Sequence, residues 1–159
     1  MSNKSWQDYF LGIAEQVKTR SKDKNTNIGA VIVDEGNIII STGYNSFPRG
    51  IDDNVPERQE RPEKYFWFAH AERNAIYAAA KKGISTDGTT MYLTCGVPCT
   101  GCAIAIIQAG IKRVYFKKGA IITHSQKTNV QKWREEADRS MEMFDEAGVE
   151  MIAYENDLH

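Results

Sequence analysis

Two short clusters of residues in the sequence have side chains that can bind a metal ion and activate water. The first is His70-Ala71-Glu72, and the second is Pro98-Cys99-Thr100-Gly101-Cys102. Imidazole nitrogen and thiolate sulfur are ligands that zinc prefers, and three of them leave the fourth tetrahedral position to water. One histidine with two cysteines is therefore typical of a catalytic zinc centre rather than a structural one.

The carboxylate of Glu72 supplies the base that such a centre needs. Bound zinc lowers the pKa of its water from about 15.7 toward about 7, and another group must then accept the proton. Glu72 follows His70 closely in the sequence, so both side chains start from the beginning of one predicted helix. We expect one Zn²⁺ per chain, held by His70, Cys99 and Cys102, with Glu72 as the catalytic residue.

Each cluster stands where a helix is predicted to begin after a loop. A helix N-terminus has free N–H groups and a partial positive charge, and both favour thiolate over thiol. Cys99 and Cys102 have the i, i+3 spacing that lets both side chains face one point from a first helical turn. The order of the clusters and their places at helix starts together favour a single metal site.

The cysteine count constrains the other interpretations. The chain has three cysteines, and an odd number cannot close into a full set of intrachain disulfides. A structural zinc site would need a fourth protein ligand, for which Cys95, His124 and His159 are the candidates. Cys95 ends a predicted strand and is expected to face the core as a small apolar residue. Taken alone, C-x-x-C is also compatible with a redox pair or half of a zinc knuckle.

Length and composition limit the class of protein that the sequence can encode. The chain has 159 residues and a formal net charge of −1, which corresponds to one ordinary globular domain, 1–159. The near-zero charge disfavours a strongly basic nucleic-acid scaffold. The polar N-terminus lacks the apolar core of a signal peptide, and the longest apolar runs are far shorter than a membrane span. We therefore expect no membrane partner. We also expect a cytoplasmic protein, because clustered cysteines that bind metal rather than form disulfides are typical of a reducing compartment.

Hydrophobic periodicity predicts an alternation of helices and strands. Helices are expected at 6–20, 69–82, 99–109 and 130–147, and strands at 28–33, 38–43, 89–94, 113–116 and 149–154. Strands separated by helices pair in parallel, so the last two strands should be parallel. The predicted fold is α/β, a three-layer α/β/α sandwich around a mixed five-stranded sheet. The long irregular stretch 44–62 is expected to be a lid or a binding loop.

Several further segments make the sequence similar to the deoxycytidylate (dCMP) deaminases of the cytidine deaminase-like superfamily. H-x-E followed by P-C-x-x-C is the signature of zinc-dependent nucleobase deaminases, in which the glutamate is not a ligand. Asn74, in H-A-E-x-N-A-I, distinguishes this branch from the tRNA adenosine deaminases and the riboflavin-pathway deaminases. The other matching segments are 20–23, 28–33, 43–45, 52–53, 106–112 and 146–149.

This resemblance implies a reaction and a set of substrate contacts. The reaction is hydrolysis of dCMP to dUMP and ammonia, which supplies dUMP for thymidylate synthesis. Glu72 would take a proton from water and transfer it to N3 of cytosine, and in a second step it would help to protonate the leaving amino group. Asn45, Asn74 and the backbone N–H of Ala71, with that of Cys99, are expected to contact the nucleotide. The 5′-phosphate needs cations, for which Lys22 is the first candidate and Arg49 the second.

The resemblance also implies regulation and assembly. Members of the family respond to dCTP and dTTP, so these nucleotides are candidate regulators, although Ser46 stands where several members have glycine. A homo-oligomer, hexamer or dimer, is expected. The family often has an aromatic residue over the base, and Tyr115, Phe116 and Trp133 are candidates, although a core role is favoured for them. His124 is expected at the surface or near the substrate.

Two alternative functions stay open. One is a deaminase of the same fold that acts on another cytosine or guanine-type nucleoside or nucleotide, or on single-stranded nucleic acid. The absence of a patch that combines aromatic and basic residues argues against the polynucleotide. The other is a zinc-stabilised binding module without catalysis. Glu72 discriminates against the module, because a purely structural site has no use for a carboxylate beside an open coordination position.

Overall fold

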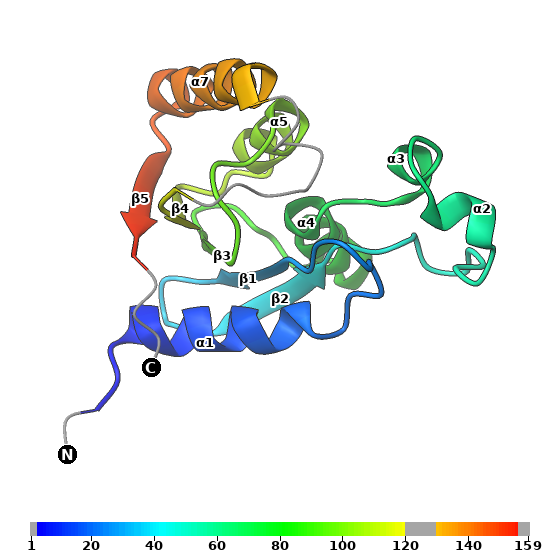
Figure 1. Cartoon of the computed structure of the whole chain (residues 1–159). Helices are drawn as coiled ribbons and strands as arrows, with labels where there is room; N and C mark the ends of the chain where they lie inside the picture. The colour runs from blue at the N-terminus through cyan, green and yellow to red at the C-terminus, as the bar shows by residue number, and fades with distance from the viewer. Residues whose placement is uncertain (1–2, 120–129, 156–159) are drawn as a thin grey trace.

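A mixed five-stranded sheet forms the centre of the protein, as seen in the computed structural model (Figure 1). The structure describes residues 3–119 and 130–155. The strands, in chain order, are β1 (Gly29–Val33), β2 (Ile39–Tyr44), β3 (Thr90–Leu93), β4 (Arg113–Lys117) and β5 (Glu150–Tyr154), and their spatial order is β2-β1-β3-β4-β5. β1 is antiparallel to both neighbours, whereas β3, β4 and β5 are parallel. The predicted mixed sheet with two parallel final strands is confirmed.

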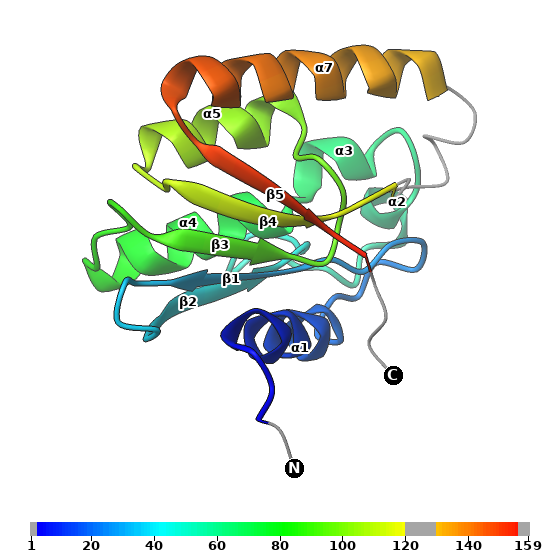
Figure 2. The same ribbon diagram turned by 90° about the vertical axis from the view of Figure 1, so that its left-hand side faces the viewer.

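Helices cover both faces of this sheet, which gives the predicted three layers (Figure 2). On one face lies α1 (Trp6–Lys18), and on the other lie α4 (Ala71–Lys82), α5 (Thr100–Gln108) and α7 (Val130–Ala147). All residues of β1 are buried, and its side chains alternate between the two cores. This is why its sequence is a continuous apolar run rather than an alternating one.

The helices that follow the two clusters begin slightly later than predicted. α4 begins at Ala71 and α5 at Thr100, because His70 and Cys99 have extended backbones and serve as the N-caps. Both side chains therefore leave the chain just before the first helical turn. In the described part of the chain, no helix combines the length and apolar character needed to cross a membrane.

The stretch predicted to be irregular, 44–62, contains a short helix, α2 (Pro56–Gln59), and a second short helix, α3 (Lys64–Trp67), follows it. Together they project from the body of the molecule as a lobe, which we define as residues 47–68 (Figure 1). Pro56 begins α2 at the position where a missing N–H costs nothing. The ends of the lobe are joined by an antiparallel bridge between Ser46 and Ala69, with N–H···O distances of 3.1 and 2.9 Å.

A buried ion pair ties the lobe to the loop before β1. Lys64 Nζ lies 2.9 Å from Asp23 Oδ2, and both side chains are only 7% exposed. Asp23 also accepts hydrogen bonds from the backbone N–H groups of Asn25 and Thr26. The carboxylate therefore shapes its own loop and holds the lobe beside it.

Close packing between β2 and α4 sets the position of the first cluster. Gly43 of β2 lies so near α4 that a Cβ atom there would overlap the backbone of Ala71 and Ala75. Only glycine permits this approach, and α4 begins directly after His70. The distance between the sheet and the start of α4 thus depends on one missing side chain.

We predict that Gly43→Ala lowers the free energy of unfolding by about 2–4 kcal/mol, because α4 must move away from the sheet. Gly12→Ala is the matched control, since a Cβ there would meet no atom within 4 Å. In the middle of α1 that change should raise stability by about 0.5–1 kcal/mol. Urea unfolding measures both, and equal stability of the two variants would contradict the packing argument.

Candidate metal centre

The three predicted metal ligands lie together where the N-termini of α4 and α5 meet. The ligand atoms of His70, Cys99 and Cys102 all lie within 4.8 Å of one another. The Sγ atoms of Cys99 and Cys102 are each 3.4 Å from His70 Nδ1. A tetrahedral zinc ion with bonds of about 2.0–2.3 Å needs ligand atoms roughly 3.3–3.8 Å apart. The donor set and its spacing therefore fit Zn²⁺.

Electrostatic coupling within the cluster favours a thiolate. The hydrogen bond with Cys102 lowers the pKa of Cys99 to about 4. The same hydrogen bond raises the pKa of Cys102, since that thiol supplies the shared proton. The hydrogen bond with Cys99 also raises the pKa of His70. The two sulfurs thus share one proton and carry one negative charge. A metal cation that replaced this proton would be bound by two thiolates.

Glu72 lies beside this cluster in a nearly dry environment. Its side chain is only 3% exposed, and burial raises the pKa of its carboxyl group. Its Oε1 lies 3.7 Å from the Sγ atom of Cys95. Its Oε2 is buried and accepts no hydrogen bond from any described residue. A buried carboxylate oxygen without a partner is costly for stability, and this cost is typical of groups that serve a reaction.

The side-chain amides of the two asparagines predicted to contact the nucleotide form hydrogen bonds inside the protein. Asn45 is buried, donates from Nδ2 to the Thr26 carbonyl at 2.8 Å and accepts at Oδ1 from the Ile28 N–H at 2.9 Å. Its amide therefore braces the loop that leads into β1.

Asn74 donates from Nδ2 to the carbonyls of Tyr44 and Ala69, at 2.8 and 3.2 Å, and to Ser46 Oγ at 3.2 Å. It thereby connects the end of β2 to the start of α4. Ala71 is fully buried at the first position of α4.

The predicted phosphate ligands are exposed. Lys22 pairs with Asp53 of the lobe at 2.8 Å, and its side chain is 64% exposed. Arg49 is exposed at the base of the lobe. Both cations belong to the loops around the lobe rather than to the cluster of ligands.

The predicted aromatic residues have different surroundings. Tyr115 stacks on Tyr92 with ring centroids 4.7 Å apart, in the core beneath α1. This agrees with the favoured core role and removes Tyr115 from the α4 and α5 side of the sheet. Phe116 and Trp133 are both partly buried. His124 and His159 lie outside the described residues.

Sequence patterns missed a residue that supports the second ligand helix. Glu136 of α7 accepts hydrogen bonds at Oε1 from the N–H and the Oγ1 of Thr100, at 3.1 and 3.0 Å. Thr100 directly follows Cys99, so this carboxylate caps α5 at the ligand loop. No local signal could reveal it, because Glu136 is 36 residues further along the chain.

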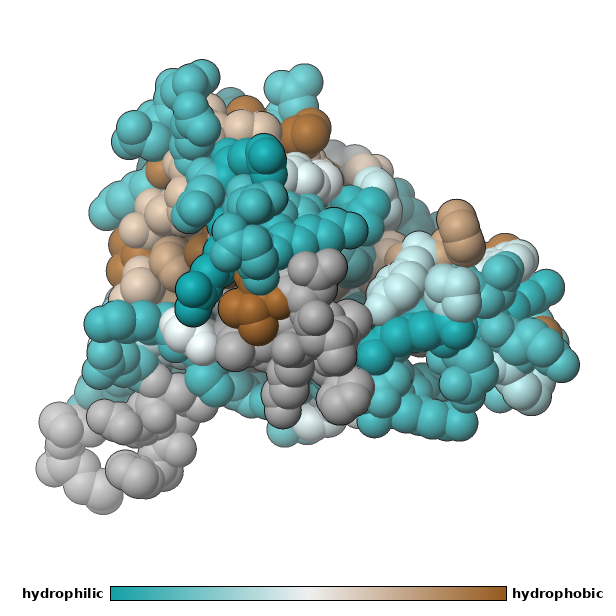
Figure 3. Space-filling view, turned by 45° about the horizontal axis from the view of Figure 1, so that its top comes forward, coloured by the Kyte–Doolittle hydropathy of each residue, from teal (hydrophilic) through white to brown (hydrophobic). Residues whose placement is uncertain are grey.

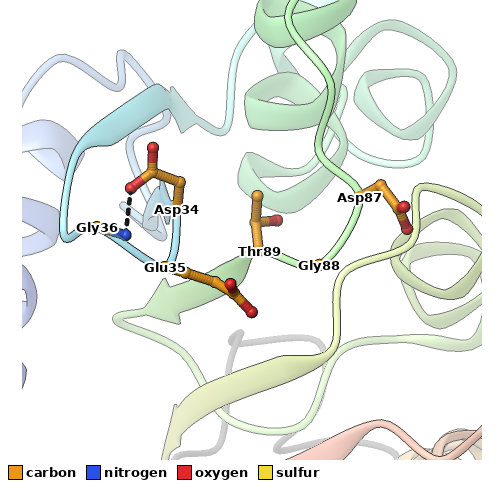
Figure 4. Close-up of a pocket in the computed structure, with 6 residues that line it drawn as sticks. All are labelled: Asp34, Glu35, Gly36, Asp87, Gly88 and Thr89. Carbon is orange, nitrogen blue, oxygen red and sulfur yellow. Dashed lines mark hydrogen bonds between the residues drawn. The ribbon is translucent and has the colours of Figure 1, made fainter.

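A separate hollow lies at the opposite end of the sheet (Figure 4). Val33 of β1 pairs with the first residue of β3 there, whereas the metal ligands follow the other end of β3. The cavity has a volume of about 390 Å³ and is lined by Asp34, Glu35, Gly36, Asp87, Gly88 and Thr89. Asp34 already accepts from two backbone N–H groups, and Glu35 pairs with Lys112. This hollow is not part of the metal centre.

The family model and the similar proteins all indicate the same family. Residues 4–118 match the family described as the cytidine and deoxycytidylate deaminase zinc-binding region. A probable deoxycytidylate deaminase of Caenorhabditis elegans is 46% identical over 67% of this chain, and the match spans only about half (54%) of that protein. The human deoxycytidylate deaminase is 41% identical over 70% of this chain and 64% of its own length.

Two further relatives match along nearly their whole length. An uncharacterised deaminase encoded in the luxG 3′ region of Aliivibrio fischeri is 37% identical, over 92% of this chain and 91% of its own. The crystal structure of a dCMP deaminase from the cyanophage S-TIM5, in complex with dCMP and dUMP, superimposes with a TM-score of 0.72 at 25% identity. The superposition covers 97% of this chain and all of that one.

We predict that Glu136→Ala weakens zinc binding by about 10–100-fold, because Thr100 and the adjacent Cys99 lose their anchor. Asp138→Ala, an exposed acidic residue of the same helix, is the control and should leave zinc affinity unchanged. Competition with a chromophoric chelator measures both affinities. Unaltered affinity in Glu136→Ala would mean that the cap does not position the ligand.

Proposed function

The chain belongs to the cytidine and deoxycytidylate deaminase family, and on this basis we propose that it converts dCMP and water to dUMP and ammonia. The observation that carries the proposal is the buried Glu72 carboxylate, one oxygen of which has no partner among the described residues, next to a cluster that suits zinc. A purely structural metal site would gain nothing from such a carboxylate. The likeness to a dCMP deaminase seen with its substrate and product supports the choice of nucleotide.

The proposed reaction divides the work between the metal and Glu72. Zinc bound by His70, Cys99 and Cys102 would supply a Lewis acid that activates water for attack at C4 of cytosine. Glu72 accepts the proton of that water at its free oxygen and delivers it to N3. Glu72 then takes the remaining proton of the attacking water and passes it to the amino group, which leaves C4 as ammonia. The raised pKa of Glu72 suits a group that must both accept and donate a proton near neutral pH.

The backbone at the start of α4 supplies the proposed contacts to the base. The N–H of Ala71 lies in the first turn of a helix, where no carbonyl of the same helix accepts from it. The N–H of Cys99 lies one position earlier relative to its helix, at the N-cap of α5. For Asn45 and Asn74 we propose contacts to the sugar that use the capacity left by their internal hydrogen bonds. That capacity is the second N–H of Asn45 and the carbonyl oxygen of Asn74.

Lys22 is the proposed phosphate ligand, with Arg49 as a second cation. Lys22 extends from the loop before β1 toward Asp53 of the lobe. An incoming phosphate carries more charge than one carboxylate and would compete for the same ammonium group. Because the pair with Asp53 is exposed, it is worth little and is readily exchanged.

The wider setting is also part of the proposal. The chain would act as a single deaminase domain, 1–159, that supplies dUMP for thymidylate synthesis in the cytoplasm. None of the three cysteines forms a disulfide, which is consistent with a reducing compartment. We also propose dCTP and dTTP as regulators, which the assay below tests directly.

A homo-oligomer, dimer or hexamer, is proposed for the assembly. Hydrophobic side chains reach the surface in separate places (Figure 3). Phe66 of α3 is 82% exposed, and Tyr77 of α4 and Ile104 of α5 are each about half exposed. Burial of such side chains against a second copy would supply the driving force for association.

We predict that the enzyme deaminates dCMP with a kcat/KM at least tenfold above that for deoxycytidine, because only dCMP offers a phosphate to Lys22. Lys22→Met should lower kcat/KM for dCMP by about 10–100-fold and leave deoxycytidine unchanged. Lys24→Met, an exposed residue of the same loop, is the control. A panel of dCMP, CMP, deoxycytidine, dCTP and a cytosine-bearing oligonucleotide, with and without dCTP and dTTP, measures these values. Equal rates for dCMP and deoxycytidine would refute phosphate recognition.

We predict that Glu72→Gln abolishes turnover, by about a thousandfold or more, yet retains one zinc per chain. The amide keeps the shape of the side chain but cannot carry the proton. Glu57→Gln, on the surface of α2, should be fully active. Turnover assays with metal analysis of the same samples decide the matter, and near-normal activity of Glu72→Gln would remove it from the mechanism.

A further inference from the structure

The third cysteine lies against the proposed catalytic carboxylate. Cys95 is only 4% exposed and belongs to the core between the sheet and α4, as expected for a small apolar residue. Its sulfur, however, is oriented to donate a hydrogen bond to Oε1 of Glu72 at 3.7 Å. The thiol thus contacts the one titratable side chain that the reaction requires.

The backbone at Thr94 and Cys95 is hydrogen-bonded to both strands that flank β3. The N–H of Thr94 donates to the Gly29 carbonyl of β1 at 3.1 Å. The carbonyl of Cys95 itself accepts from the N–H of Lys117 in β4 at 2.7 Å. The position of the sulfur is therefore anchored on the central strands, whereas Glu72 belongs to α4.

The terminal torsion of a glutamate has no sharp preference, so a carboxylate without contacts can rotate over a wide range. One donor fixed on one oxygen removes much of this freedom. In Glu72 that oxygen is Oε1, and Oε2 is the oxygen without a partner among the described residues. The two oxygens are thus distinguished by their surroundings before any substrate arrives.

We propose that Cys95 is a positioning residue for Glu72, whose S–H holds Oε1 so that Oε2 is presented to the water and the cytosine ring. This inference rests on the function proposed above and assigns a role to the cysteine that is not a metal ligand. Burial raises the pKa of the Cys95 thiol well above its ordinary value, which is consistent with a permanent S–H donor. A thiol is a weak donor, so it orients the carboxylate without binding its proton strongly.

Infrared spectroscopy of the zinc-loaded full chain tests the contact itself. The chain has three cysteines, and two of them become thiolates on zinc, so a single S–H stretching band should remain. Glu72→Ala should move this band to higher wavenumber, because the thiol loses its acceptor. An unshifted band would overturn the inference. Two or three S–H bands in the zinc-loaded wild type would instead show that Cys99 and Cys102 are not the ligands, which is a failure of the metal site and not of the contact.

Kinetics test the consequence of the contact. Cys95→Ala should lower kcat for dCMP by about threefold to fivefold, the scale of one weak hydrogen bond, with KM within about twofold. Cys95→Ser, which restores a donor, should recover most of the loss, and zinc content should stay at one per chain in both variants. Equal losses in the alanine and serine variants, or a change in KM alone, would show that Cys95 only fills space. If neither variant folds, the band shift in Glu72→Ala decides the proposal without them.

Discussion

The whole site depends on the requirement that two helix N-termini meet within the coordination radius of one metal ion. The ligands of the cluster come from α4 and α5, which are separated in sequence by a strand and its loops. Their ligand atoms nevertheless fall within 4.8 Å of one another. A shift of either helix by about 1 Å would exceed the tolerance of metal–ligand bonds. The packing around both helices is therefore part of the chemistry.

Different contacts meet this requirement at the two helices. At α4 the sheet comes as close as backbone atoms allow, because Gly43 has no side chain, and Asn74 bonds the end of β2 to the residues before the helix. At α5 the support comes from the other direction, where Glu136 of α7 caps Thr100. One helix is pressed on the sheet and the other is held by a neighbouring helix, and the two helices also share one core cluster.

The sequence was sufficient for the fold and for selecting three side chains that the structure brings together in one cluster. The apolar run of β1 and the spacing of Cys99 and Cys102 are local patterns, and local patterns can be interpreted without coordinates. The contacts of Glu136 and Cys95 could not be foreseen, because each depends on which elements become neighbours in three dimensions. For Asn45 and Asn74, motif spacing could not show that their amides brace the backbone near β2, and their contacts to the nucleotide stay a prediction. The short helices in the lobe were missed for a related reason, since four-residue helices have too little periodicity to detect.

The bridge between Ser46 and Ala69 has a consequence for how the fold can diversify. Because the two ends of the lobe are hydrogen-bonded to each other, residues 47–68 leave the body and return to it at one point. Insertions or deletions inside this excursion need not move His70, which follows the return point directly. The fold can thus exchange this segment for a longer or shorter one while His70 keeps its place, which is a route by which one deaminase scaffold can acquire new substrates.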